Sequence, residues 1–275
     1  MNKLFGPILF SFLLASCSSV EKNKLKKELV RGEESFNYAD KNGQFIVKLS
    51  SGFNKGKNHF FTKRVLESPN KNSDNVLEQS VALSDIGVLN KKETILRPKI
   101  SQYNVWFEGK KYFTELKFNE QKKAIDIKLL SPESQWNGNK VVKLPSTKAL
   151  YCFFSQVIEC AKTAGFLDKA IKNESGTMNF YIIWEGYPYY SETLSSFPSE
   201  VLSKAQLEYD GKTKDVERRF NLKVNGQSIF YVVDQKEQMK KMFWVSEGIS
   251  MISKLSKQES NNGESDLKEI GVSFE

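Results

Sequence analysis

The sequence predicts a mainly β fold, in which an antiparallel meander forms a curved sheet or a partly open barrel with one packed helix. Apolar and polar residues alternate over many short segments, which is the pattern of strands with one buried and one solvated face. The breaks between these segments are short and polar, as in antiparallel meanders. A single segment, residues 147–163, departs from the two-residue period and predicts the helix.

The first group of predicted strands shows the alternation clearly. Phe45, Val47 and Leu49 share one face of the first strand. Pro98 cannot donate a backbone hydrogen bond, so its strand is expected at a sheet edge or to end there. The strands predicted in this group are residues 44–50, 59–67, 79–85, 93–100, 112–119 and 124–130.

A second group of predicted strands follows the helix. A further helical piece is expected at 166–172, and residues 248–255 fit either a helix or a strand. Residues 270–274 are expected to add an edge strand. The strands predicted between these segments are residues 178–184, 189–194, 204–209, 218–224, 228–234 and 242–246.

Two segments, 105–116 and 182–193, resemble each other and align without gaps. Both are predicted as β-hairpins with Glu-Gly at the turn, where glycine adopts a positive φ at little cost. With two-residue turns, Val105 faces Tyr112 and Ile182 faces Tyr189, whereas a three-residue turn reverses this parity. The repeat indicates either a duplication or two aromatic hairpins of independent origin.

The predicted helix carries a cluster of apolar side chains and two of the three cysteines. Phe153, Phe154, Val157 and Ile158 are candidates for an apolar plug against the sheet. Cys152 and Cys160 form a disulfide only if the helix stops between them. Eight helical residues rise about 12 Å, whereas bonded cysteines have Cα atoms within about 7 Å. Two buried free thiols are the alternative.

The N-terminal residues are expected to lie outside the domain. Lys3 precedes an apolar stretch from Leu4 to Ala15. This stretch is shorter than the roughly 20 residues of a membrane-spanning helix, and it is typical of a signal peptide. Residues 1–16 are therefore expected to be a signal peptide, and the polar residues 17–43 a flexible tether.

The remaining residues are divided by composition. A β-rich domain is expected over residues 44–255, followed by a polar linker and C-terminal segment over 256–275. The domain is either one sheet or two submodules, 44–146 and 175–255, joined by helical residues 147–172.

The residues Leu14-Ala15-Ser16-Cys17 resemble the lipobox of bacterial lipoproteins. The resemblance implies cleavage before Cys17, a diacylglycerol on its sulfur and an acylated N-terminus, hence a membrane partner bound through lipid. Two or more acyl chains give a stable anchor without a spanning helix. Ser18 follows the cysteine where an aspartate commonly signals inner-membrane retention, so the family pattern implies the outer membrane, at its periplasmic face.

The composition and the motifs argue against several classes of function. The formal net charge is +8, but the lysines are dispersed and show no basic stripe alternating with aromatic residues, so no nucleic-acid partner is expected. His59 is the only histidine, which leaves too few ligands for a zinc site. No nucleotide or hydrolase motif is present, so neither a metal, a cofactor nor catalysis is expected.

These observations predict a lipid-anchored protein of the cell envelope with a non-catalytic binding or structural role. The strand arrangement and the Trp106-Phe107-Glu108-Gly109 hairpin also resemble uncharacterised periplasmic β-rich bacterial proteins, a resemblance that implies no site. One alternative is a carrier or receptor for a lipid or a lipoprotein, similar to the lipoprotein-localisation receptors, whose half-open barrels hold helices against an apolar cavity. Another alternative is an envelope hydrolase that uses His59. An envelope-protein partner is also compatible with the sequence.

Overall fold

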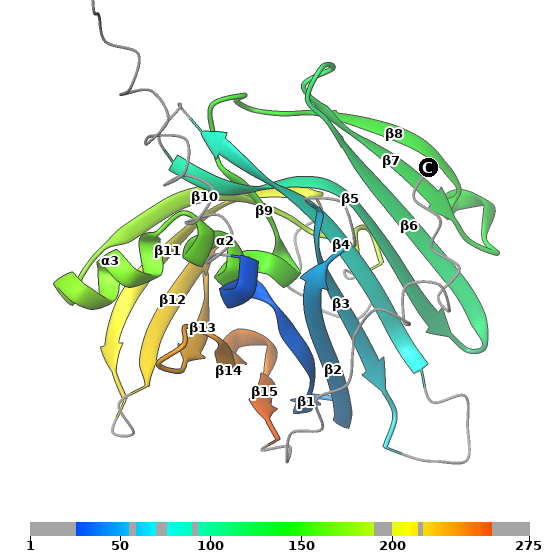
Figure 1. Ribbon diagram of the computed structural model, residues 1–275. Helices are drawn as coiled ribbons and strands as arrows, with labels where there is room; N and C mark the ends of the chain where they lie inside the picture. The colour runs from blue at the N-terminus through cyan, green and yellow to red at the C-terminus, as the bar shows by residue number, and fades with distance from the viewer. Residues whose placement is uncertain are drawn as a thin grey trace, which may run out of the picture.

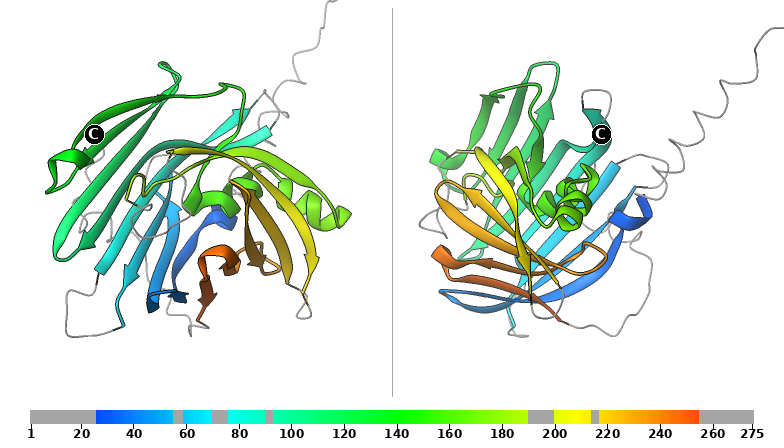
Figure 2. Two further views of the ribbon diagram at one scale, coloured as in Figure 1. Left: turned by 180° about the vertical axis from the view of Figure 1, so that it is seen from behind. Right: turned by 90° about the vertical axis from the view of Figure 1, so that its left-hand side faces the viewer.

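The computed structural model describes residues 26–54, 59–69, 76–89, 93–189, 200–213 and 217–254. Within these ranges, fifteen strands form one continuous sheet. The sheet curves around two helices on its concave side and is not closed into a barrel (Figure 1; Figure 2). The predicted mainly β, curved and mostly antiparallel architecture is therefore confirmed.

The chain builds one half of the sheet from its centre outward. After a helical turn at 26–29, eight strands follow in order, and each pairs antiparallel with the next. The 3-10 helix η1 (Ser134–Trp136) lies between the last two. The strands are β1 (Arg31–Asp40), β2 (Gly43–Phe53), β3 (His59–Glu67), β4 (Val76–Leu89), β5 (Glu93–Phe107), β6 (Lys110–Asn119), β7 (Ala124–Leu130) and β8 (Gly138–Lys143).

The chain then builds the other half from the far edge inward. The short strand β9 (Tyr151–Phe153) leads into η2 (Phe154–Gln156), α2 (Val157–Thr163) and α3 (Phe166–Asn173). The next strand pairs parallel with β9, and the later strands pair antiparallel until the last one meets β1. These strands are β10 (Thr177–Ile183), β11 (Leu202–Lys212), β12 (Arg218–Val224), β13 (Gln227–Val233), β14 (Met239–Trp244) and β15 (Ile249–Ser253), with η3 (Val245–Glu247) before β15.

Strand β1 lies in the middle of the sheet, within the segment that the sequence analysis assigned to a tether. It pairs with β2 on one side and β15 on the other. Phe36 is fully buried and Tyr38 is nearly so. The strand is polar in sequence because only these two central side chains enter the core. Its two neighbours satisfy its backbone hydrogen bonds, so long-range pairing rather than apolar content fixes it in the sheet.

The predicted helix at 147–163 is shorter than expected. The structure places β9 at Tyr151–Phe153, and the α-helix begins only at Val157. All three residues of β9 are buried, and β9 pairs with β10 in the register Tyr181↔Tyr151. A short apolar run buried on both faces does not alternate, so its pattern does not distinguish a strand from a helix. The later helical piece at 166–172 corresponds to α3.

Of the two arrangements that the sequence left open, one sheet or two submodules, the structure has one sheet. The pair β1·β15 joins the halves, with Phe36 opposite Ser253 and Tyr38 opposite Met251. The main apolar core contains side chains of both halves, among them Phe36, Phe60 and Phe220. The concave face is therefore shared by the whole chain, and no boundary separates residues 44–146 from residues 175–255.

The two predicted hairpins have different outcomes. The first is confirmed, because Glu108 and Gly109 form a two-residue turn in which Val105 faces Tyr112. The second is wrong, because β10 ends at Ile183 and the residues after it form a turn that contains a cis Tyr187-Pro188 bond. Part of the strand predicted at 189–194 lies outside the described residues.

The concave face carries an apolar row that crosses the strands. The register places Phe220, Tyr231, Met242, Met251 and Tyr38 side by side on β12, β13, β14, β15 and β1. Side chains directly opposite one another on an antiparallel pair point to the same face and contact each other. The row therefore forms a continuous floor beneath α2.

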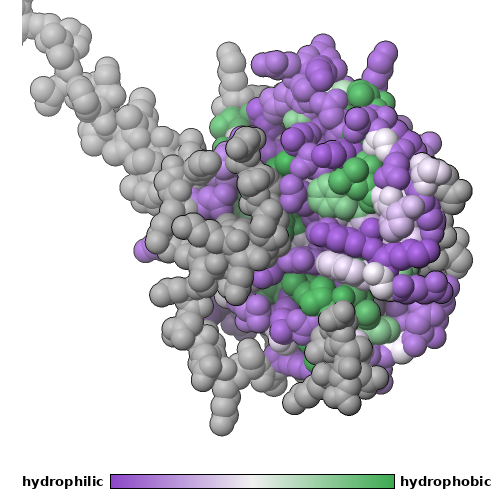
Figure 3. Space-filling view, turned by 90° about the vertical axis from the view of Figure 1, so that its right-hand side faces the viewer, coloured by the Kyte–Doolittle hydropathy of each residue, from purple (hydrophilic) through white to green (hydrophobic). Residues whose placement is uncertain are grey.

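The strands β6, β7 and β8 extend beyond the curved part of the sheet (Figure 1). A second core packs one face of β6 and β7 against the β9 and β10 edge, with Leu116 and Ile127 near Phe153 and Ile183. The molecular face on the β6–β8 side is mainly hydrophilic, with small apolar areas between the polar ones (Figure 3). Lysines on β8 are typical of an edge strand protected against further pairing.

Candidate binding cavity

A cavity lies between the concave face and the segment that contains η2 and α2. Its volume is about 290 Å³. Most of its wall is apolar, and its polar residues come from β1 and the turn after it, from β3, β4, β5 and β13, and from η2 and α2. The apolar lining includes Phe45, Leu49, Leu66, Val105, Phe107, Phe154, Val157, Ile158, Met239, Met242, Trp244, Ile249 and Met251.

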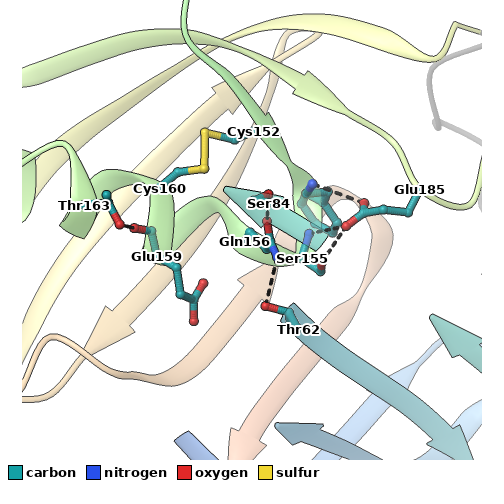
Figure 4. The surroundings of a disulfide bond; sticks show 10 residues. Thr62, Ser84, Cys152, Ser155, Gln156, Glu159, Cys160, Thr163 and Glu185 are labelled. Atoms are coloured by element: carbon teal, nitrogen blue, oxygen red, sulfur yellow. Dashed lines mark hydrogen bonds between the residues drawn. A yellow bond between two sulfur atoms is a disulfide. The ribbon is translucent and has the colours of Figure 1, made fainter. Parts of the chain in front are cut away.

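A disulfide ties the helical side of the cavity to the sheet. Cys152 is in β9 and Cys160 is in α2, and their sulfur atoms are bonded with Cα atoms 6.2 Å apart (Figure 4). The short distance is possible because the helix begins after β9, so the two cysteines do not lie on one continuous helix. The bond encloses residues 153–159, so it restrains the segment that covers the cavity.

Gln156 ties the same segment to the opposite half of the sheet. The side chain is fully buried. The hydroxyl of Ser84 donates to Gln156 Oε1 at 2.6 Å, and Gln156 Nε2 donates to Thr62 Oγ1 at 3.3 Å (Figure 4). Gln156 Nε2 also donates to the carbonyl of Ala82 at 3.0 Å. Buried polar groups are retained when their hydrogen bonds are satisfied. These bonds fix η2 against β3 and β4.

Glu185 supplies a third attachment. It is 1% exposed, and its carboxylate accepts hydrogen bonds from the backbone N–H groups of Phe154 at 3.1 Å and Ser155 at 2.9 Å, and from the Ser155 hydroxyl (Figure 4). The first N–H groups of a helical segment have no partner within it, and Glu185 satisfies two of them. Burial raises the pKa of Glu185, and the bonds from Ser155 and Phe154 oppose that rise.

The structure separates the four residues predicted as an apolar plug. Phe154, Val157 and Ile158 line the cavity. Phe153 belongs to β9 and packs in the second core with residues of β6 and β7. The cause is that β9 ends at Phe153, whose side chain points to the opposite face from Cys152, whereas the other three residues lie in η2 and α2.

Polar residues of β1, β3 and β4 form one part of the cavity wall. Arg64 and Glu78 form an ion pair, and the Arg64 guanidinium lies 5.9 Å from the centre of the Tyr38 ring. Asp40 and Asn42 complete this part of the lining. The arginine and the glutamate neutralise each other, and the Asp40 carboxylate adds a negative charge to this wall.

Glu159 provides a carboxyl on the other side of the cavity. Its side chain points away from the disulfide, toward the interior (Figure 4). Burial raises the pKa of Glu159, and the charges of Arg31 and Lys162 lower it in part. Tyr231, from the row of concave side chains, also lines the cavity and is 3% exposed.

The remaining sequence candidates do not join this cavity. His59 lies on β3 and pairs with Asp85, which also bonds Lys99 at 3.1 Å. Among the described residues no group of three metal-ligating side chains occurs. None of the helices in the described ranges has the length and apolar character of a transmembrane span. Cys17 lies outside the described residues.

Several cavity residues were not predicted as site residues. Gln156 and Glu159 are polar positions within an apolar helical segment, which is the signal that could have identified them. Tyr231, Met242 and Met251 belong to separate alternating strands. Only the register across β13, β14 and β15 brings them together, so no local sequence pattern indicates their proximity.

The chain was compared with known families and proteins. No protein-family model, no curated protein and no solved structure matches it. Its function is therefore inferred from its own residues and geometry.

Proposed function

We propose that the chain is a lipid-anchored protein of the bacterial cell envelope that binds an apolar ligand in the cavity without converting it chemically. The observation that carries the proposal is the mostly apolar cavity of about 290 Å³ beneath α2. Small-molecule pockets have volumes of roughly 300–1,000 Å³ and mostly apolar walls with a few polar groups. The cavity is close to the lower end of this range.

The cavity size favours a small ligand or a single alkyl chain. An apolar protein cavity of about 150 Å³ holds one benzene molecule, and this cavity has roughly twice that volume. A lipoprotein carries several acyl chains, so the carrier function is favoured only for a lipid with one chain. The three attachments of the covering segment, through Cys160, Gln156 and Glu185, support a preformed pocket.

A cavity-filling variant tests the binding function. Met242→Trp should sharply reduce uptake of an apolar fluorescent probe such as 1-anilinonaphthalene, because Met242 lies on the cavity floor. Val141→Trp is the matched control, since Val141 is 63% exposed on edge strand β8. Equal uptake by both variants, or no uptake by the unaltered chain, would contradict the proposal.

The proposed anchor rests on Cys17 and its lipobox. We place the protein at the periplasmic face of the outer membrane, bound through acyl chains on Cys17. In cells supplied with labelled palmitate, Cys17→Ser should lose the label and should not be cleaved before residue 17. A Cys17→Ser product that is still labelled and normally processed would disprove the anchor. It would leave the proposed binding function untouched.

A further inference from the structure

Two polar groups reach into the cavity without a hydrogen bond to another residue. Glu159 comes from α2 and Tyr231 from β13, and both line the cavity. Over the part of the chain that the structure describes, the Tyr231 hydroxyl makes no hydrogen bond to another residue, and neither does the Glu159 carboxyl, which its own backbone N–H stabilises. A buried polar group without a partner costs about 1–3 kcal/mol. Their shared exposure to the cavity indicates that a bound molecule supplies the missing partner.

The two groups line the cavity from its floor and from the helix above it. Tyr231 stands between Phe220 and Met242 in the row on the concave face, and α2 packs above this face. Burial raises the pKa of Tyr231, and the charges of Glu159 and Glu185 add to this rise. An acceptor and a donor of hydrogen bonds therefore face the cavity, in addition to the polar wall that Asp40, Asn42, Arg64 and Glu78 form.

The charges around Glu159 have both signs. Arg31 is 7% exposed, donates to the Met239 carbonyl at 3.0 Å and lies 3.5 Å from Glu34. Lys162 lies 3.5 Å from Glu237. Arg31 and Lys162 both act on the Glu159 carboxyl. An anionic ligand would be repelled by Glu159, while Arg31 and Lys162 lie outside the cavity lining and are each paired with a glutamate, so neither compensates a charge on the ligand.

We infer that the cavity holds a single-chain amphiphile with an uncharged hydroxyl head, an inference that rests on the proposed binding function. The hydroxyl donates a hydrogen bond to Glu159 and accepts one from Tyr231, while the alkyl chain lies along Met242, Met251 and Ile158. A hydroxyl offers one donor and two acceptor lone pairs. It also loses less hydration free energy on burial than a carboxylate or an ammonium group.

The inference is tested with three probes that share one tail: dodecanol, dodecanoate and dodecylamine. The full chain carrying Cys17→Ser, with bound lipid removed on a hydrophobic resin, is loaded with the apolar fluorescent probe, and each compound is titrated against it. We expect dodecanol to displace the probe at about 10-fold lower concentration than either charged compound, the factor that one good hydrogen bond provides.

Two substitutions locate the head group. Tyr231→Phe and Glu159→Met should each lower the affinity for dodecanol by about 10-fold. The affinity for the apolar probe should stay within about two-fold of that of the unaltered chain, because its binding depends on burial of apolar surface. Tyr181→Phe and Glu200→Gln are the matched controls, since neither residue lines the cavity. Probe binding also reports that each variant is folded.

The outcomes separate the two proposals. A chain that takes up no probe disproves the proposed function itself. A chain that takes up the probe but ranks the three compounds equally, or prefers dodecanoate or dodecylamine, overturns the hydroxyl-head inference alone. Unchanged dodecanol affinity in both Tyr231→Phe and Glu159→Met overturns it as well.

Discussion

Buried carboxyls distinguish this core at the scale of single residues. Glu185 is held by three hydrogen bonds from Phe154 and Ser155, whereas Glu159 faces the cavity and is stabilised by the charges of Arg31 and Lys162 and by its own backbone N–H. Both have a pKa raised by burial. The first serves to position the covering segment, and the second is available to a ligand.

The raised pKa of Glu159 predicts a pH dependence of stability. The unfolded carboxyl titrates near its ordinary pKa of 4.5, and the folded one titrates higher. The folded state therefore retains a proton that the unfolded state has lost, so the free energy of unfolding falls as pH rises from about 4.5 through the folded pKa. Glu159→Gln should reduce this decrease in the free energy of unfolding. Urea titrations at roughly one-unit intervals between pH 4 and 8 measure the decrease.

The control for this measurement is Glu200→Gln, a substitution at an exposed carboxyl. It should leave the fall in stability with pH as large as in the unaltered chain. A Glu159→Gln variant whose stability decreases as much as that of the control would show that Glu159 does not contribute to the pH dependence.

Turns and cross-links act at the scale of the elements. The turn between β5 and β6 has φ 50° at Glu108 and 75° at Gly109, and the turn between β12 and β13 has φ 49° at Asn225 and 75° at Gly226. The backbones match, but only the second turn has the Asn-Gly pair that this geometry favours. Glutamate with positive φ is uncommon, and asparagine is enriched there.

Exchanging the two turn residues should move stability in opposite directions. Glu108→Asn should raise the free energy of unfolding by about 0.5–1 kcal/mol, and Asn225→Glu should lower it by a similar amount, because a non-glycine side chain resists positive φ to different degrees. Denaturant titration measures both. A loss of stability in Glu108→Asn would show that the exposed Glu108 side chain has a role beyond its backbone conformation.

The Cys152–Cys160 bond predicts a separate effect on α2. Its sequence separation is 8, and closing so short a loop contributes about 2.5 kcal/mol in the chain-entropy model. The double change Cys152→Ala and Cys160→Ala should lower the free energy of unfolding by about that amount. It should also weaken probe uptake, since the bond restrains the segment that covers the cavity. Unaltered uptake would show that Gln156 and Glu185 suffice to hold it.

The sequence predicted the elements that a local pattern defines, but not those that long-range strand pairing defines. Alternation identified most strands, and the Glu108-Gly109 turn fixed the register of Val105 and Tyr112 correctly. β1 and β9 were missed because pairing with distant neighbours, and not an alternating pattern, defines them. The carrier alternative expected a cavity with Phe153, Phe154, Val157 and Ile158 as its plug, and three of these four line it. The floor of the cavity depends on cross-strand register, which a one-dimensional pattern does not contain.

At the scale of the whole molecule, the pair β1·β15 makes one folding unit of two halves. Core residues of both halves contact α2 and each other. Proteins open in cooperative units that follow such contacts. Native-state hydrogen exchange should therefore give the central amides of β4 and β12 the same free energy of opening, within about 1 kcal/mol. A difference well above this would indicate two independently unfolding modules.

Because the first and last strands are paired, the chain can be opened at another turn without changing the order of the strands in the sheet. The Lys254 N–H donates to the Ser35 carbonyl at 2.8 Å, so the end of β15 lies beside the first half of β1, and a short glycine-rich bridge could join Lys254 to the residues just before Arg31. A circularly permuted chain, opened between Glu108 and Gly109, would then keep every strand neighbour while its ends moved to the β5–β6 hairpin. The coding sequence could therefore start at a different strand while the protein keeps the same fold.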